Sequence, residues 1–190
     1  MFQKTGASAP VFYLRYHRDM DYQAKLATPF ALLGIRCDQD ALLGIDFLPP
    51  GDAPQPPASV LARAVCDQLL NYIENPDAVF SIPLKYNATP HRQKVWQAML
   101  NIPRGCTRSY GELAAELHSC AQAVGQACGA NPIPIIIPCH RVTGKAGLGG
   151  FMKHAEGAPL DIKRWLLAHE RITPSPPAPL PKGARGEGRT

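Results

Sequence analysis

Residues 109–128 read SYGELAAELHSCAQAVGQAC, which is two short amphipathic segments separated by a break at His118. Ser109 and Glu112 have the spacing of a capping box, in which a hydroxyl and a carboxylate each accept a hydrogen bond from a free backbone N–H at a helix start. Ser119 is expected to cap the second segment in the same way. Two short helices joined by a tight turn indicate a helix-turn-helix, and an ordinary helical hairpin is the alternative.

The second helix of this pair, predicted over residues 120–128, is built of small residues. Gly125 costs a helix roughly 1 kcal/mol relative to alanine, so its presence indicates that something approaches this face closely. Close packing on another helix would explain the small face. Insertion into a DNA groove would explain it too, because small side chains let the backbone approach sugars and phosphates.

Helical patterns lie on both sides of this pair. Thr89 and Pro90 occupy the N-cap and first-turn positions of a helix that ends near Pro103. Another helix is predicted over residues 159–170, whose apolar residues recur on one face. Beyond it, residues 173–190 are rich in Pro and Gly and nearly free of large apolar groups, so we expect a disordered basic tail.

The amino-terminal part has a different pattern. Apolar runs over residues 30–35 and 42–48 flank a polar segment and predict a β-hairpin, and Ser59 is positioned to cap a following helix. No residues in this part have the spacing of a catalytic site. The predicted organisation is a flexible amino terminus, an α+β scaffold domain, a functional domain and the tail, over residues 1–9, 10–87, 88–172 and 173–190.

The composition is that of a globular protein with a basic carboxy-terminal half. Of the 190 residues, 45% are hydrophobic and 18% are charged, and the 20 prolines indicate substantial loop content. The length fits one domain or two small ones, which excludes a large multidomain enzyme. The net charge is −2 over residues 1–86, +5 over 87–172 and +2 over 173–190. Positive charge confined to the second half favours a polyanionic partner.

The sequence does not indicate export, membrane insertion or metal binding. The first ten residues lack the basic and apolar regions of a secretory signal, and no apolar run approaches the roughly 18 residues that span a bilayer. We therefore expect a cytoplasmic protein that does not bind membranes. The six cysteines are scattered without a paired spacing, which predicts reduced thiols, no metal and no cofactor.

Residues 131–142 read NPIPIIIPCHRV and contain the cysteine best placed for chemistry. The prolines and isoleucines predict a stiff, buried, extended strap that ends at Cys139, followed by His140 and Arg141. A free thiol with a pKa of about 8.5 is mostly protonated at neutral pH, but a nearby base or cation increases its thiolate fraction. Cys139 is therefore the candidate nucleophile, and an inert buried cysteine is the alternative. Arg141 is expected to be structural and to pair with a carboxylate or with backbone carbonyls.

The strap resembles the active-site signature of the O6-alkylguanine-DNA alkyltransferases, also called methylated-DNA–protein-cysteine methyltransferases. The similarity extends to five further motifs, VWQAM at 95–99, SYGELA at 109–114, AVG at 123–125, GLGGF at 147–151 and KRWLLAHE at 163–170. Residues from about 88 to 170 are therefore well covered. Residues 30–87 resemble only loosely the variable amino-terminal domain of this family, and the tail does not resemble it.

The resemblance implies a fold and an activity. The implied fold is α+β, with a small ribonuclease-H-like α/β domain followed by a mainly helical, winged-helix-like domain that carries the helix-turn-helix and the active-site cysteine. The implied activity is DNA repair by direct damage reversal. The protein would bind duplex DNA through the minor groove, flip out an O6-alkylated guanine and take the alkyl group irreversibly onto its own cysteine. O4-alkylthymine is a second candidate substrate, and the protein is expected to be a monomer in solution that can assemble cooperatively on DNA.

Roles for single residues follow from the same resemblance. By similarity, Cys139 is the alkyl acceptor, His140 acts through a water as its base, and Glu170 orients that histidine. Tyr110 would protonate the leaving guanine at N3, and Asn131 would tie the recognition helix to the strap. Taken one at a time, each of these residues also has a structural explanation, as a cap, a turn residue or a partner of the strap.

Pocket residues are implied in the same way. The expected substrate pocket is formed by Val142, Leu148, Phe151 and Met152. Backbone carbonyls of Cys139 and Val142 would read the exocyclic amine of the base, and the backbone N–H of Met152 would donate to O6.

The implied DNA contacts lie on and around the second helix, at Tyr110, Ser119, Ala121, Gln122, Ala123 and Gly125. Gln122 is a departure from the family, which normally has an arginine there that enters the base stack and fills the gap left by the flipped guanine. A glutamine lacks the planar cation that stacks on bases. Three explanations are open: Gln122 fills the gap less well, the search for lesions is impaired, or the natural protein has another residue at this position.

Two other classes of function fit parts of the sequence. A non-catalytic sensor could use the same pocket to recognise lesions, but alkyltransferase-like sensors lack the cysteine that is present here. A cysteine hydrolase could use Cys139 and His140. That hydrolase would leave the helix-turn-helix without a function, and no oxyanion hole is evident.

Overall fold

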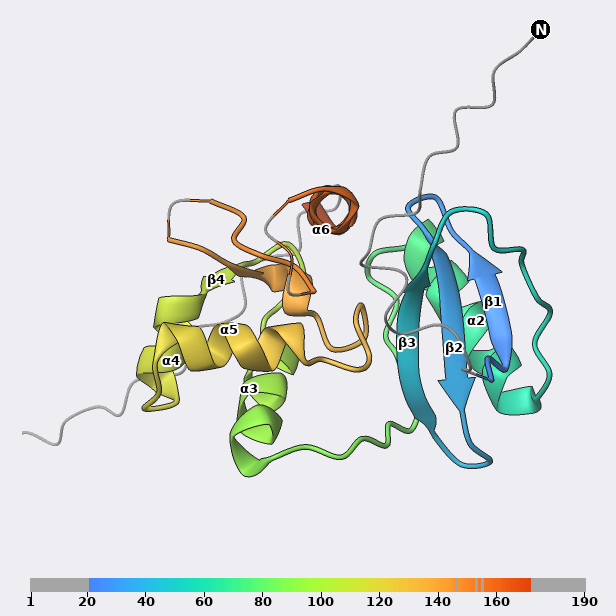
Figure 1. The fold of residues 1–190 in the computed structure, drawn as a ribbon, viewed down its shortest axis with the longest axis horizontal. Helices are drawn as coiled ribbons and strands as arrows, with labels where there is room; N and C mark the ends of the chain where they lie inside the picture. The colour runs from blue at the N-terminus through green and yellow to red at the C-terminus, as the bar shows by residue number, and fades with distance from the viewer. Residues whose placement is uncertain (1–20, 146, 153, 155, 172–190) are drawn as a thin grey trace, which may run out of the picture.

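A computed structural model describes residues 21–145, 147–152, 154 and 156–171 of the chain. It has an amino-terminal lobe, which is a sheet with one helix, and a carboxy-terminal lobe of short helices (Figure 1). The α+β class predicted from the sequence is confirmed. The predicted flexible amino terminus and the predicted tail lie outside the described residues.

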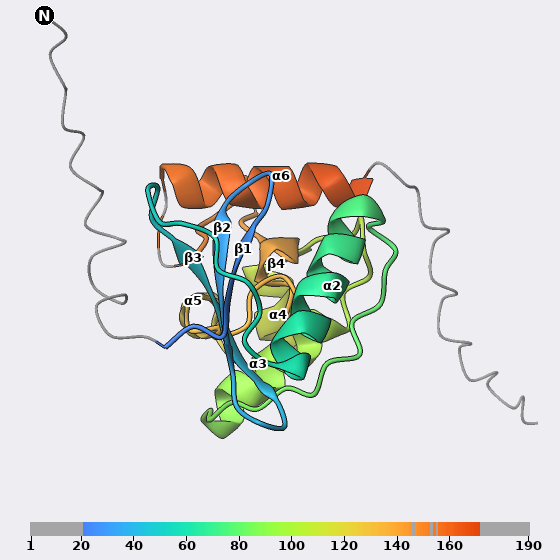
Figure 2. The ribbon, with the colours of Figure 1, turned by 90° about the vertical axis from the view of Figure 1, so that its right-hand side faces the viewer.

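The amino-terminal lobe is a three-stranded antiparallel sheet in the order β1-β2-β3, formed by Ala24–Ala27, Leu32–Cys37 and Leu42–Leu48. β2 and β3 form the predicted hairpin. The sequence does not predict β1, because its alanines and lysine have little β-propensity. Helix α2, Val60–Glu74, packs along the sheet (Figure 2), and the Ser59 side chain accepts a hydrogen bond from the Ala62 amide at 3.1 Å, as expected for its cap.

Over its described residues, the carboxy-terminal lobe contains four α-helices, a 3-10 turn η1 and a parallel pair of two-residue strands. In chain order these are α3 Pro90–Leu100, β4 Arg108–Ser109, α4 Tyr110–Glu116, α5 Ala121–Gly129, η1 Cys139–Arg141, β5 Val142–Thr143 and α6 Ala158–Arg171. The predicted cap at Thr89 is confirmed, and so is the capping box, in which Ser109 Oγ accepts from the Glu112 amide at 3.1 Å and Glu112 accepts from the Ser109 amide at 2.6 Å.

The cap predicted at Ser119 is wrong. The Ser119 amide donates to the Ala114 carbonyl at 2.8 Å, and the preceding His118 has a φ of 50°. These are features of a Schellman motif, so Ser119 completes the end of α4 and does not begin α5. Cys120 is the N-cap residue of α5 without a side-chain cap, and the Ser119 hydroxyl lies 2.9 Å from His91 Nε2.

The strap between α5 and η1 is buried as predicted, but it is not extended. The Ile137 amide donates to the Ile133 carbonyl at 2.9 Å, and Ile135 has a φ of 76°. Asn131 explains the turn, since its Oδ1 accepts from the Ile133 amide at 3.0 Å and its Nδ2 donates to the Ile137 carbonyl at 2.7 Å. One side chain thus holds both ends of the turn together.

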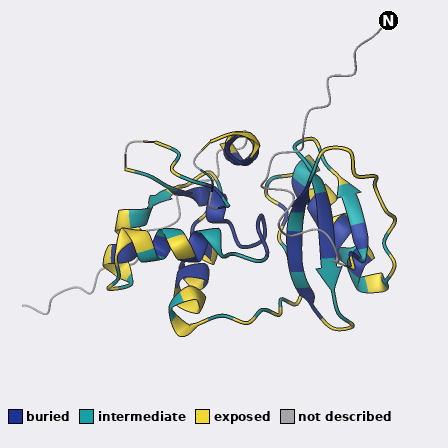
Figure 3. Cartoon of the chain, in the orientation of Figure 1, coloured by how far each residue is buried: buried dark blue, intermediate teal, exposed yellow. Residues whose placement is uncertain are grey.

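One continuous cluster of buried apolar side chains runs through both lobes, and Figure 3 shows buried residues on the facing parts of the sheet and the helices. The Ile45 amide on β3 donates to the Pro132 carbonyl of the strap at 2.9 Å. Trp96 joins α3 to α5, because its indole N–H donates to the Ala127 carbonyl at 2.8 Å. Within the described ranges, none of the helices is both long and apolar enough to cross a membrane.

Candidate active site

A pocket of about 200 Å³ lies between α5 and the segment that follows β5. It is lined by Tyr110, Gly125, Cys128, Gly129, Cys139, Gly150, Phe151 and Met152. Five residues predicted for the site therefore come together around one cavity. The other residues predicted for the catalytic site and the pocket, which are Asn131, His140, Val142, Leu148 and Glu170, are not among its lining residues. Val142 is fully buried, and Asn131 holds the turn of the strap.

Cys139 begins η1 at the wall of this pocket and is 4% exposed. Burial raises the pKa of its thiol, because the low-polarity surroundings disfavour a thiolate. A hydrogen bond from the Asn131 side chain and the charge of Lys163 act in the opposite direction without cancelling the effect of burial. The resting cysteine is therefore a thiol, and its activation requires a base that accepts the proton.

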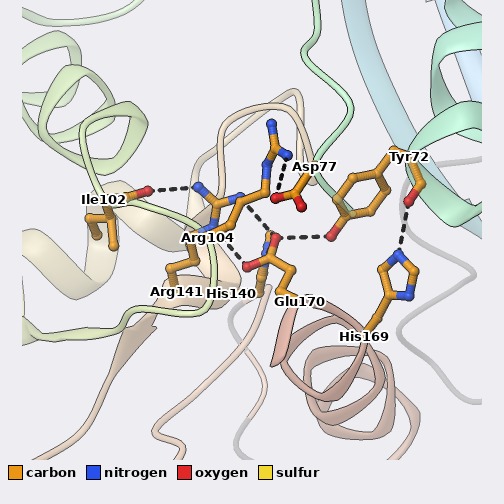
Figure 4. Close-up of polar contacts among 8 residues, drawn as sticks. All are labelled: Tyr72, Asp77, Ile102, Arg104, His140, Arg141, His169 and Glu170. Atoms are coloured by element: carbon orange, nitrogen blue, oxygen red, sulfur yellow. Dashed lines mark hydrogen bonds and ion pairs between the residues drawn. The ribbon is translucent and has the colours of Figure 1, made fainter. Parts of the chain in front are cut away.

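His140 and Arg141 directly follow Cys139 in η1 and form a buried network with Glu170 (Figure 4). His140 Nε2 lies 2.8 Å from Glu170 Oε1, and Arg141 donates to both carboxylate oxygens at 2.9 and 2.8 Å. Arg141 also donates to the Ile102 carbonyl at 2.7 Å. Arg141 is thus bound to a carboxylate and a backbone carbonyl, as the sequence predicts, and is fully engaged inside the protein.

The charges in this network define the state of the histidine. Burial tends to raise the pKa of the Glu170 carboxyl, but hydrogen bonds from His140 and Arg141 and the charge of Arg141 outweigh it and hold that pKa well below its ordinary value. Burial lowers the pKa of His140 despite the carboxylate. Because an ionised carboxylate only accepts hydrogen bonds, Nε2 carries the proton. The buried Nδ1, which has no hydrogen-bond partner among the described residues, is left as the acceptor.

Tyr110, the first residue of α4, lines the pocket together with Cys139. Its hydroxyl donates to the Gly150 carbonyl at 3.1 Å, and burial raises the pKa of the phenol, so the group stays a donor at neutral pH. The ring packs tightly, because a Cβ at Gly149 would meet Tyr110 at 2.7 Å and the φ of Gly149 is 65°. A Cβ at Gly125 would lie 3.9 Å from the same ring. The small face of α5 thus accommodates Tyr110 and the pocket.

Comparisons with known proteins agree with this arrangement. A family model described as "6-O-methylguanine DNA methyltransferase, DNA binding domain" matches residues 90–172. A methylated-DNA–protein-cysteine methyltransferase of Haemophilus influenzae is 36% identical over 162 residues, which cover 80% of this chain and 87% of that protein. The chain belongs to the methylated-DNA–protein-cysteine methyltransferase family.

Other members of the family are also similar to this chain in sequence and in structure. The constitutive methylated-DNA–protein-cysteine methyltransferase of Bacillus subtilis is 45% identical over 109 residues, which are 56% of this chain and 64% of that relative. The crystal structure of Mycobacterium tuberculosis O6-methylguanine methyltransferase has a TM-score of 0.68 at 32% identity, covering 83% of this chain and 95% of that one. Mycobacterium tuberculosis OGT in complex with DNA has a TM-score of 0.65 at 33% identity, covering 78% and 91%. The resemblance found in the sequence is confirmed.

The residues that the family resemblance assigns to DNA contact lie around the start of α5. Ala121 and Gln122 are exposed in its first turn, whereas Ala123 and Gly125 are half-buried. Ser119 is half-buried at the preceding turn beside His91. Their contact with DNA stays a prediction.

Lys163 is a central residue that sequence reasoning did not single out from its motif. It is fully buried on α6, and its ammonium donates to the carbonyls of Val142, Leu148 and Gly150 at 2.6, 2.7 and 3.0 Å. Burial lowers its pKa to about 8. The Val142 carbonyl, expected to read the base, is therefore bound to Lys163. A lysine among the apolar residues of the predicted helix face was the available signal.

Replacing Lys163 with methionine should lower the free energy of unfolding by about 2 kcal/mol, since three buried carbonyls would lose their donor. Urea unfolding at pH 7 measures this, and the exposed Lys94→Met change should stay within about 0.5 kcal/mol. The folded pKa of Lys163 is below its unfolded value, so the wild type should gain stability relative to the variant as the pH rises above 8. If Lys163→Met were as stable as Lys94→Met at pH 7, the proposed role of Lys163 would be contradicted.

Tyr72 is the other residue that sequence reasoning missed. It comes from α2, 98 positions before Glu170, and its hydroxyl donates to Glu170 Oε1 at 2.9 Å. Nothing in the local pattern of α2 distinguishes it from a core aromatic residue. In the described part of the chain, no three His, Cys, Asp or Glu residues are grouped to hold a metal ion, and the absence of metal and cofactor stays a prediction.

Proposed function

We propose that this protein repairs DNA by direct reversal of damage, moving an alkyl group from O6 of guanine to its own Cys139 in a single turnover. The observation that carries the proposal is the position of Cys139, in the wall of a pocket and directly before a buried His140–Glu170 pair. Membership of the methyltransferase family supports it. The assignment makes the protein a methylated-DNA–protein-cysteine S-methyltransferase that is consumed by its reaction.

The chemistry follows from the protonation states of the network. His140 Nδ1 takes the thiol proton, directly or through a water, and the Glu170 carboxylate stabilises the imidazolium that results. The Cys139 thiolate then attacks the alkyl carbon. A C–S bond forms as the C–O6 bond breaks, and the electron pair stays on the guanine. Tyr110 lines the same pocket and supplies a proton to N3 of the leaving base.

Other predicted residues would shape the site. Phe151 and Met152 line the pocket and would contact the base, with the Met152 amide donating to O6, while Leu148 and Val142 would support the wall through their contacts with Lys163. Asn131, which holds the turn below Cys139, would link α5 to the thiol.

The partner would be duplex DNA, bound through the minor groove by the first turn of α5. The exposed Ala121 and Gln122 and the excess of positive charge in residues 87–172 support this orientation. We further propose that the lobes correspond to a ribonuclease-H-like domain over 10–87 and a winged-helix-like domain over 88–172. In this proposal the protein is monomeric in solution and assembles cooperatively on DNA.

Replacing Gln122 with arginine should accelerate repair of O6-methylguanine in duplex DNA by about 10-fold. Flipping a base costs a few kcal/mol, and an arginine would stack in the vacated space and compensate part of that cost. Single-turnover kinetics on duplex DNA measure the gain, and the free base O6-benzylguanine, which needs no flipping, is the control substrate. An equal acceleration on both substrates would contradict a role of Gln122 in flipping.

The experiment that tests the proposed function measures restored guanine in a duplex that contains O6-methylguanine, with the substrate in five-fold excess. One equivalent of guanine per protein, with no further turnover, is expected. Multiple turnovers would indicate a true catalyst. Lesion binding without any repair would overturn the proposal and favour a non-catalytic sensor.

A further inference from the structure

The amino-terminal lobe reaches the proposed active site through Tyr72. This tyrosine lies on α2, is 1% exposed, and contacts two successive residues of α6. Its hydroxyl donates to Glu170 Oε1 at 2.9 Å, and its backbone carbonyl lies 2.8 Å from His169 Nε2 (Figure 4). We propose that Tyr72 is a positioning residue for alkyl transfer, which acts on His140 through Glu170. This inference rests on the proposed function.

The geometry makes Tyr72 part of the same hydrogen-bond system as the base. Three donors converge on Glu170 Oε1, namely the Tyr72 hydroxyl, His140 Nε2 at 2.8 Å and an Arg141 nitrogen at 2.8 Å. Glu170 Oε2 is held by the Arg141 Nε at 2.9 Å. The Tyr72 hydroxyl and His140 Nε2 therefore bind the same carboxylate oxygen. The hydrogen bond from Tyr72 reduces the negative charge that this oxygen presents to the histidine.

The phenol is suited to this role because it remains a donor. Burial and the neighbouring Glu170 carboxylate raise the pKa of Tyr72, so its hydroxyl is protonated over the whole physiological range. Its ring is fixed by Phe80, at a centroid distance of 5.5 Å, and by His169, at 5.2 Å. A fixed donor of this kind restricts Glu170 to one orientation at low entropic cost.

The sign of the effect on His140 follows from the charges that face it. These are Glu170 and Lys163 on α6 and Arg141 on η1, while Arg104 and Arg141 face Tyr72. Without the Tyr72 hydroxyl, Oε1 loses one of three donors and presents more negative charge to His140. The imidazolium is then more stable and the pKa of His140 rises. Because only neutral His140 can accept the thiol proton, the acid limb of the rate profile moves to higher pH.

The test compares Tyr72→Phe with the wild type and with Tyr86→Phe. Tyr86 is a matched control, because it is a partly buried tyrosine that packs on Trp96 at 5.0 Å and is not hydrogen-bonded through its hydroxyl to any described residue. Single-turnover alkyl transfer is measured from pH 5 to 9. We expect Tyr72→Phe to shift the acid limb upward. At pH 7 it should also react about 10-fold more slowly, because Glu170 loses the donor that fixes its orientation toward His140, and Tyr86→Phe should match the wild type.

Two further measurements separate positioning from a merely structural role. NMR titration of the histidine ring carbons should show a higher pKa for His140 in Tyr72→Phe, and this readout does not depend on activity. In a Glu170→Gln background, Tyr72→Phe should have no additional effect on the rate, because the carboxylate through which Tyr72 acts on His140 is already absent. An unchanged pH profile and His140 pKa in Tyr72→Phe would overturn the inference, whereas a wild type without alkyl transfer would overturn the proposed function alone.

Discussion

Replacing Cys139 with alanine is expected to reduce alkyl transfer by at least about 1,000-fold, to the background of the uncatalysed reaction, because the nucleophile that forms the C–S bond is removed. The pocket offers a matched control. Cys128 lines the same cavity and is also buried, but its sulfur lies 3.6 Å from Met99 Sδ. Burial raises the pKa of the Cys128 thiol to about 12, so it does not supply a thiolate at neutral pH.

Cys128→Ala should therefore retain transfer at a rate within about 3-fold of the wild type, since it changes the wall of the pocket but leaves the base next to Cys139 intact. Both rates are measured by single-turnover kinetics with the same duplex. Loss of transfer in Cys128→Ala with full transfer in Cys139→Ala would reverse the assignment of the nucleophile. The lesion-binding affinity of Cys139→Ala should stay close to that of the wild type, which shows that the pocket is preserved.

Replacing Glu170 with glutamine is expected to destabilise the protein and to slow the reaction. The side chain of Glu170 is 1% exposed and neutralises the buried Arg141. Removing one partner of a buried ion pair leaves an uncompensated charge, so the free energy of unfolding should fall by about 3 kcal/mol. Transfer should slow by about 100-fold, because a neutral amide no longer stabilises the imidazolium of His140.

Thermal unfolding and single-turnover kinetics measure these two effects of Glu170→Gln. The exposed Glu116, which pairs with Arg108, provides a control, and Glu116→Gln should change stability by less than about 0.5 kcal/mol. The folded pKa of Glu170 lies below its unfolded value. The stability difference between wild type and Glu170→Gln should therefore be constant near neutral pH and shrink below about pH 4. A difference that grows on acidification would contradict this account.

Local patterns predicted the helices and their caps because the signals lie within a few residues of each other. The Ser109–Glu112 capping box and the Thr89 cap are such signals, and both are confirmed. The Ser119 cap is wrong because a hydroxyl residue after a break is compatible both with the start of α5 and with the end of α4. The hydrogen bond from the Ser119 amide to Ala114 selects the second.

The candidate site was predictable in its motif residues and not in its long-range partners. Cys139, His140 and Tyr110 come from motifs with a recognisable order, and the structure brings Cys139 and Tyr110 to one pocket. Tyr72 reaches Glu170 from another lobe, and Lys163 binds carbonyls that lie 13 to 21 positions away. Contacts between residues this far apart in the chain depend on tertiary packing, so no regular spacing in the sequence indicates them.

The most direct test of the central claim locates the transferred alkyl group in the protein. After reaction with a duplex containing O6-methylguanine, the intact protein should gain about 14 Da once, the mass of one methylene. The tryptic peptide over 109–141 contains Cys120 and Cys128 as well as Cys139, so fragment ions must place the adduct. The account predicts a single adduct on Cys139. A protein that restores guanine but carries the adduct on another residue, or carries none, would contradict it.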